Sequence, residues 1–290
     1  MLPAPPRKIL LATDLSARCD RALDRAALLA SEWNAELFAV HAVERSDDAY
    51  ANDLELHVPA WRRSHDARLV AEERLRRDLE QCAVKIHTIV ERGEPLDVVL
   101  AAIDTQGCGL VVTGIARDET LGRFGLGTTV HGLVRRSPVP VLVVRERARR
   151  RYANVVVASD FSTASRHVLR TAAALFPQRS LQVFHAYDTR LAGLVDDPAS
   201  HDAESRQGAA REYRDLIAAG DLGDAASRCT LVVERGPPDL LLQQYAYAHD
   251  VDVVVVGARG GSALAHVLLG STAAEVLEAV TCDVLVVRGS

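Results

Sequence analysis

An internal repeat constrains this chain more than any other feature, because its second half carries the same succession of segments as its first. KILLATDLSARCDRALDRAALLA (8–30) corresponds to NVVVASDFSTASRHVLRTAAALF (154–176), and VERGEPLDVVLAA (90–102) to VERGPPDLLLQQY (233–245). Each half closes on VLVVR, and each has the usual size of one domain. We therefore predict two domains, residues 1–147 and 152–290, and interpret the arginine-rich RERARRRY (145–152) between them as a solvated linker.

Short β-branched runs alternate with longer helix-period segments in each half, which predicts an α/β fold with a parallel sheet and crossover helices. Runs such as LVVTG and VDVVVVG are apolar on both faces, as strands covered by helices on both sides require. We expect five strands and four helices per half. The first half should have helices from about Ala17 to Glu32, over 61–83, after Pro95 and from about Thr128, with Asp14–Ser16 capping the first.

Two further details concern packing within the first half and pairing between the halves. The face of the 61–83 helix should carry Trp61, His65, Leu69, Leu75, Leu79 and Cys82. Pro140 lies in the expected last strand of the first half and cannot donate to a ladder, which predicts that this strand is at a sheet edge. An exposed edge invites pairing, so the halves could meet through their last strands.

Composition and charge exclude several classes of protein. The net charge of −5 gives no general field for nucleic acid, no apolar run reaches the ~18 residues of a membrane span, and the N-terminus has no secretion-signal pattern. The 5 cysteines are scattered without a C-x-x-C pair, which fits a reducing compartment, and the 10 histidines show no metal-ligand spacing. We predict a cytoplasmic protein that binds no nucleic acid, membrane or structural metal.

A glycine-containing loop follows the apolar run VDVVVV in the second half. Its sequence, GARGGSALAHVLLGST (257–272), has the spacing G-x2-G-x9-G-S between an expected strand and an expected helix. Glycines allow another group to approach the backbone, and the free N–H groups and positive dipole end of a helix attract anions. We expect a phosphate chain to be held by Gly257, Gly260, Gly270, Ser271 and Thr272. The alternative is that the glycines only shape a tight strand-to-helix turn.

Because of this loop and the repeat, the chain resembles a tandem member of the universal stress protein family. Two copies of that family's domain would cover nearly all 290 residues. The resemblance implies Rossmann-like domains of strand order 3-2-1-4-5, ATP binding, and dimerisation through the fifth strand. It also implies adenosine contacts from the Asp after the first strand and from the residue that follows a His in the second strand. In the second half these positions are Asp160, in ASDFS with Ala158 and Ser159, and Ala186 after His185.

The first half departs from this pattern in its glycine loop. The corresponding residues are Thr13, Asp14, Ala42, Gly114, Gly127 and Thr128. Arg117 stands where the second half has Gly260, and its side chain could fill the phosphate groove, so we expect weaker or absent nucleotide binding here. In the opposite interpretation Arg117 or Arg123 contacts phosphate.

The sequence favours binding over catalysis. Neither Lys8 nor Lys85 follows a glycine loop, so no Walker A motif is present, and the expected site contains no evident nucleophile–base pair. Our first hypothesis is an ATP-binding stress-response regulator that is not an enzyme and holds ATP, with or without Mg²⁺, chiefly in its second half. It would act on an unknown regulatory protein as a homodimer or intrachain pseudo-dimer. The alternatives are a slow ATPase or autophosphorylating protein, with Ser159, Ser162, Ser271 or Thr272 as acceptors, and a scaffold that binds no nucleotide.

Overall fold

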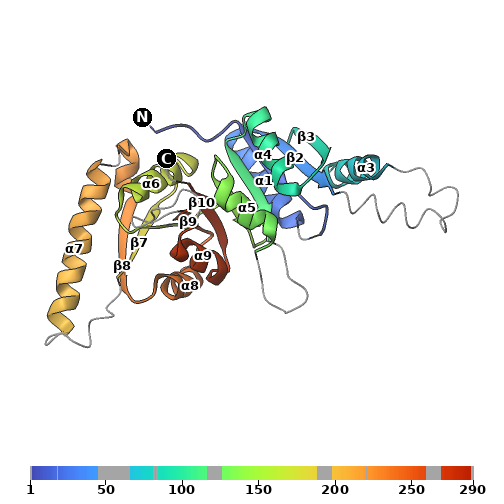
Figure 1. Cartoon of the computed structure of the whole chain (residues 1–290). Helices are drawn as coiled ribbons and strands as arrows, with labels where there is room; N and C mark the ends of the chain where they lie inside the picture. The colour runs from blue at the N-terminus through green and yellow to red at the C-terminus, as the bar shows by residue number, and fades with distance from the viewer. Residues whose placement is uncertain are drawn as a thin grey trace. The chain divides into compact units, whose positions relative to one another are not determined.

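A computed structural model describes residues 2–17, 19–44, 66–80, 82, 84–115, 126–187, 198–219, 221–258 and 269–288. The chain divides into two compact units. One consists of Pro6–Leu133 and Val141–Arg149, and the other of Arg150–Ser290 with the short stretches Met1–Pro5 and Val134–Pro140. Figure 1 labels their helices and strands.

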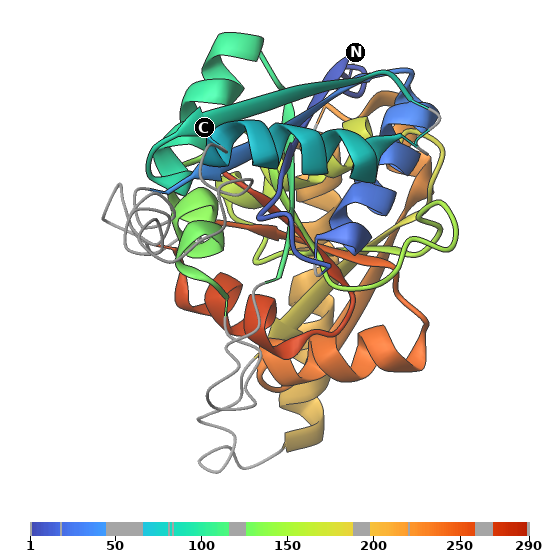
Figure 2. The same ribbon diagram turned by 90° about the vertical axis from the view of Figure 1, so that its right-hand side faces the viewer.

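The first half contains one parallel sheet. Its strands are β1 (Lys8–Ala12), β2 (Glu36–Val43), β3 (Ile86–Arg92), β4 (Leu110–Gly114) and β5 (Val141–Val144), in the spatial order β3-β2-β1-β4-β5. Its helices are α1 (Asp20–Trp33), α3 (Ala67–Leu79), α4 (Pro95–Gln106) and α5 (Thr128–Arg136). Figure 2 shows α3 running alongside β3, against which it packs.

The second half repeats this arrangement. Its strands are β6 (Val155–Ala158), β7 (Leu181–Tyr187), β8 (Cys229–Arg235), β9 (Val253–Gly257) and β10 (Asp283–Val287), in the order β8-β7-β6-β9-β10. Its helices are α6 (Thr163–Leu175), α7 (Pro198–Ala219), α8 (Pro238–Ala248) and α9 (Ser271–Ala279), with a 3₁₀ turn, η3 (Gly223–Arg228), before β8. The predicted α/β fold with a parallel sheet in each half is confirmed.

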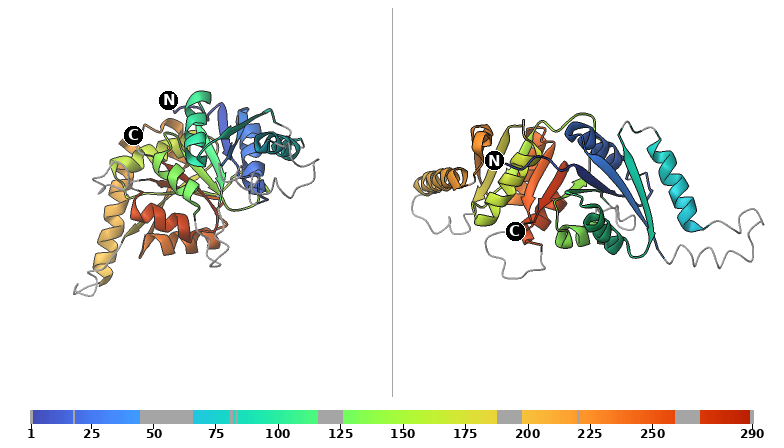
Figure 3. Two further views of the ribbon diagram at one scale, coloured as in Figure 1. Left: turned by 45° about the vertical axis from the view of Figure 1, so that its right-hand side comes forward. Right: turned by 90° about the horizontal axis from the view of Figure 1, so that it is seen from above.

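The order of the strands explains which face each helix covers. From β6 to β8 the chain moves one way along the sheet, and from β8 to β9 it crosses back in the other direction. Right-handed crossovers therefore place α6 and α7 on one face and α8 and α9 on the other. Each pair of helices is in contact, and Figure 3 shows α7 beside β8 at the edge of the second sheet. Because the order reverses between β6 and β9, the carboxyl ends of these two strands flank the point where parallel sheets usually bind ligands.

The core of each half is built largely from buried strands. All five residues of β4 are buried, as are Val253–Val256 in β9 and the whole of β10. Strands covered by helices on both faces are apolar without alternation, as in β9, while Asp283 in β10 and Thr113 in β4 are buried polar exceptions. Among the described residues, no helix is long and apolar enough to cross a membrane.

Three local expectations were wrong. Helix α1 begins at Asp20 rather than near Ala17, because the Asp14 side chain accepts a hydrogen bond within the preceding turn and so does not cap the helix. The N-cap residue of α1 is Cys19, which makes no side-chain cap bond. The buried residues of α3 are Ala71, Leu75 and Leu79, whereas Leu69 is 60% exposed. Pro140 precedes β5 instead of lying within it. Trp61 and His65 lie outside the described residues.

The interpretation of RERARRRY as a merely solvated linker also needs correction. Arg150 bonds Asp250 at 2.8 Å and Asp252 at 3.2 Å. Asp252 in turn accepts the backbone N–H groups of Ala153 and Asn154 at 2.7 and 2.8 Å. The start of the second half is therefore tied to the turn that leads into β9.

Candidate functional site

The loop after β6 is a tight polar turn that fixes Asp160. Ser159 Oγ accepts the N–H of Phe161 at 3.1 Å, and Asp160 Oδ1 accepts the N–H of Ser162 at 3.0 Å. Phe161 has φ 60°, which is rare for a residue with a bulky side chain. Strain of this kind persists only where surrounding contacts fix the conformation. Ser162 itself caps α6 by accepting the N–H of Ser165 at 3.3 Å.

The first half builds the same turn from different side chains. Thr13 Oγ1 accepts the N–H of Leu15 at 3.1 Å, Asp14 Oδ1 accepts the N–H of Ser16 at 2.8 Å, and Leu15 has φ 59°. In each half, a histidine of the neighbouring strand approaches this turn. His41 Nδ1 lies 3.0 Å from the Thr13 carbonyl oxygen, and the equivalent distance from His185 to Ser159 is 2.9 Å. These histidines hold the turn in place through contacts with its backbone carbonyl oxygens.

In the second half, the start of α9 faces the turn after β6 across a shared cavity. Gly270 is the N-cap residue: its N–H donates to the Ala258 carbonyl at 2.9 Å and its own carbonyl accepts from Ala274 N at 3.0 Å. Gly270 makes no side-chain cap bond, and the first turn of α9 contains no acidic residue. A helix N-terminus of this kind attracts anions through its N–H groups and its dipole. With φ −61° and ψ 146°, Gly270 does not need to be glycine for its conformation.

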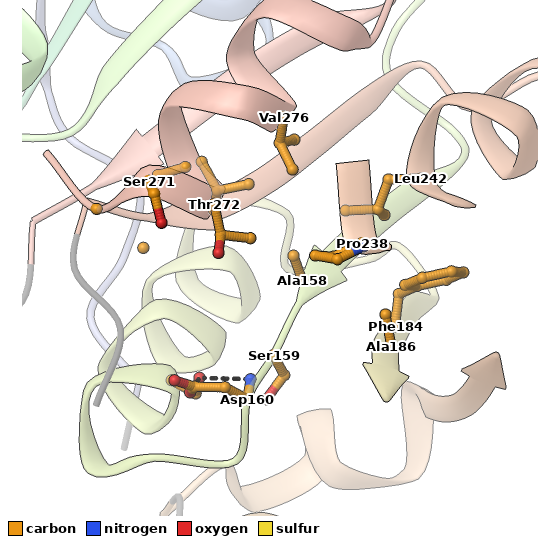
Figure 4. A pocket seen from close by; sticks show the side chains of 15 residues that line it. Ala158, Ser159, Asp160, Phe184, Ala186, Pro238, Leu242, Ser271, Thr272 and Val276 are labelled. Carbon is orange, nitrogen blue, oxygen red and sulfur yellow. Dashed lines mark hydrogen bonds between the residues drawn. The ribbon is translucent and has the colours of Figure 1, made fainter. Parts of the chain in front are cut away.

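A cavity of about 270 Å³ lies between these two features. Figure 4 shows Ser271 and Thr272 on one side of it and the carboxyl group of Asp160 on the opposite side. Phe184, Pro238 and Leu242 line a separate, apolar end, and Val276 of α9 also faces the cavity. The described lining residues include no lysine, arginine or histidine, so an anion here would be held by N–H and hydroxyl donors.

The described residues predicted for the second-half site all line this cavity. They are Ala158, Ser159, Asp160, Ala186, Gly257, Gly270, Ser271 and Thr272. The prediction for Gly260 lies outside the described residues. Sequence reasoning missed Ser165, Phe184, Pro238, Leu242, Val256, Ala273 and Val276. Strand alternation could have found Phe184, since it precedes Ala186 by two residues and so shares its face.

An equivalent cavity of about 400 Å³ exists in the first half. All six predicted residues line it: Thr13, Asp14, Ala42, Gly114, Gly127 and Thr128. Val40 replaces Phe184 at its apolar end, while Cys19, His41 and Glu44 also contribute to its lining. Arg117 and Arg123 lie outside the described residues.

Within the described ranges, no group of three or more His, Cys, Asp and Glu side chains is arranged to hold a metal ion. What the second cavity combines is a helix N-terminus with two hydroxyls, a carboxylate acceptor and an apolar end. This combination suits a ligand with an anionic group, hydroxyl groups and a flat apolar part.

Comparison with known proteins identifies the family. The model of the universal stress protein family matches residues 6–145 and again residues 151–288. The chain belongs to the universal stress protein family. The internal repeat is therefore two copies of the universal stress protein domain.

Individual relatives agree with this. The universal stress protein Sll1388 of Synechocystis is 31% identical over 152 residues, covering 47% of this chain and 98% of that protein. A structure from Pseudomonas aeruginosa described as a universal stress protein has a TM-score of 0.67 at 22% identity, over 98% of this chain and 94% of that chain. Another universal stress protein, solved in complex with cAMP, is 28% identical over 48% of this chain and 98% of that chain, with a TM-score of 0.34. The tandem fold thus has a solved counterpart of nearly the same extent.

Proposed function

We propose that this universal stress protein binds ATP chiefly in its second half and acts as a nucleotide-responsive regulator in a stress response, without enzymatic turnover. The observation that carries the proposal is the N-terminus of α9, with Ser271 and Thr272, facing Asp160 across a cavity that has an apolar end.

Each part of ATP has a matching part of the cavity. The phosphates would lie at the N–H groups and hydroxyls of Gly270–Thr272, where the helix dipole favours negative charge. Asp160 only accepts hydrogen bonds and repels phosphate, so it would receive the ribose hydroxyls. The base would lie near Ala186, Phe184 and Leu242. Because the described lining holds no cationic side chain, we expect ATP to bind as its magnesium complex, whose metal offsets phosphate charge.

The first half is expected to bind nucleotide weakly or not at all. Its cavity is lined by the residues that correspond to the second-half site. The expectation of weak binding therefore depends on Arg117, which replaces the middle glycine of the loop. Cytoplasmic location, a homodimer or pseudo-dimer through the fifth strands, and an unidentified regulatory partner complete the proposal.

The test is the nucleotide content of freshly purified protein, measured by denaturing it and chromatographing what is released. We expect about one ATP per chain, because a single site fits the proposal. Ser271→Ala/Thr272→Ala and Gly260→Arg should each remove most of it. The matched control is Thr128→Ala, which alters the equivalent of Ser271 in the first half and should leave the content unchanged.

Other outcomes separate the alternatives. Two ATP per chain would contradict the expected weakness of the first half. No nucleotide, and no thermal shift on adding ATP with magnesium or cAMP, would contradict nucleotide binding and favour a scaffold. ADP release that needs a divalent cation and disappears in Asp160→Ala would favour the slow ATPase.

A further inference from the structure

Ser165, in the first turn of α6, makes two hydrogen bonds to Asp160. Its hydroxyl donates to Asp160 Oδ1 at 2.6 Å and accepts the backbone N–H of Asp160 at 3.2 Å. Oδ1 also accepts the N–H of Ser162 at 3.0 Å. Ser165 is only 7% exposed, whereas Asp160 is exposed at the cavity. The buried hydroxyl therefore holds the carboxylate from the protein side.

The first half has cysteine at this position. The repeat aligns Cys19 with Ser165 and Asp14 with Asp160. Cys19 Sγ lies 3.0 Å from Asp14 Oδ1, so the same donor contact is made by a thiol. The two halves thus contain a natural substitution at one contact of an otherwise repeated turn.

The chemistry of the two donors differs. A hydroxyl bonded to a carboxylate at 2.6 Å is a charge-assisted hydrogen bond, which is about twice as strong as a neutral one, whereas a thiol is a weak donor and a weak acceptor. Burial first, and then the charge of Asp14, raise the pKa of Cys19 to about 11, so at neutral pH the thiol is protonated and still a donor. The halves therefore differ in how firmly the carboxylate is held.

We propose that Ser165 is a positioning residue for nucleotide binding: it holds the Asp160 carboxylate where it accepts the ribose hydroxyls, and the cysteine of the first half does this less well. The inference rests on the proposed ATP site and deepens it, because it assigns part of the difference between the halves to this position. A carboxylate already fixed in its binding orientation loses less conformational freedom when the ligand arrives.

The experiment is a calorimetric titration of the full-length chain, stripped of nucleotide, with ATP and magnesium. Ser165→Ala should raise Kd about tenfold, which is the range of one hydrogen bond to a charged group. Ser165→Cys copies the first half and should raise Kd about threefold, as expected for the weaker thiol donor. Ser227→Ala, which removes an exposed hydroxyl from η3, is the control and should match the wild type.

A double-mutant cycle separates positioning from a general structural role. In an Asp160→Ala background, Ser165→Ala should change Kd less than about twofold, because Ser165 acts through the missing carboxylate. Equal effects in both backgrounds, or wild-type affinity in both Ser165 variants, would overturn the positioning role and leave the ATP site intact. A wild-type chain that binds no ATP would instead overturn the proposed function and this inference with it. Should Ser165→Ala fail to fold, the nearly isosteric Ser165→Cys carries the same comparison.

Discussion

At the scale of single residues, Cys19 allows the environment of the first cavity to be measured directly. Burial and the neighbouring Asp14 raise its pKa from 9.0 to about 11. Only the thiolate is alkylated. At pH 8, Cys19 should therefore react about 100-fold more slowly with iodoacetamide in the folded protein than in the protein unfolded in urea. Mass spectrometry after timed iodoacetamide treatment gives both rates. Asp14→Asn should speed the reaction, because it removes the carboxylate charge.

The same pKa shift has a consequence for stability. The thiol is favoured in its neutral form when folded, so its stabilising contribution is complete below about pH 9 and is lost as the pH rises towards 11. Replacing Cys19 by serine should therefore flatten the loss of stability in this alkaline range. Alkylation of native Cys19 at the rate seen in urea would contradict the assigned environment.

At the scale of secondary-structure elements, Asp252 fixes the start of the second half to the turn before β9. Its side chain is 13% exposed and accepts the N–H groups of Ala153 and Asn154. Asp252→Ala leaves both donors without this partner and should lower the free energy of unfolding by about 2 kcal/mol. Urea denaturation followed by circular dichroism measures this. Asp250→Asn is the matched control: it removes only the exposed ion pair to Arg150 and should change stability little.

The elements also show which features the sequence could predict. Strands such as β9 were predictable, because a short continuous apolar run is typical of a parallel strand that helices cover on both faces. The start of α1 was not, since it depends on whether Asp14 caps the helix or closes the preceding turn. The polar site residues were found through their motif, whereas Phe184 and Leu242 lie in apolar segments where lining a cavity and filling the core require the same residue types.

At the scale of the whole molecule, each half has its own five parallel strands, helices and cavity, so we expect a ligand that binds one half to stabilise mainly that half. At 100 times Kd, ATP should stabilise the second half by about 2.7 kcal/mol, equivalent to about 100-fold slower exchange of amides that need that half to open. Hydrogen exchange with mass spectrometry should therefore show slowing in β6 and β9 but not in β1 and β4. Ser271→Ala/Thr272→Ala should abolish it. Equal slowing in β4 and β9 would contradict independent halves, because a ligand in one half stabilises the other only if the two open together.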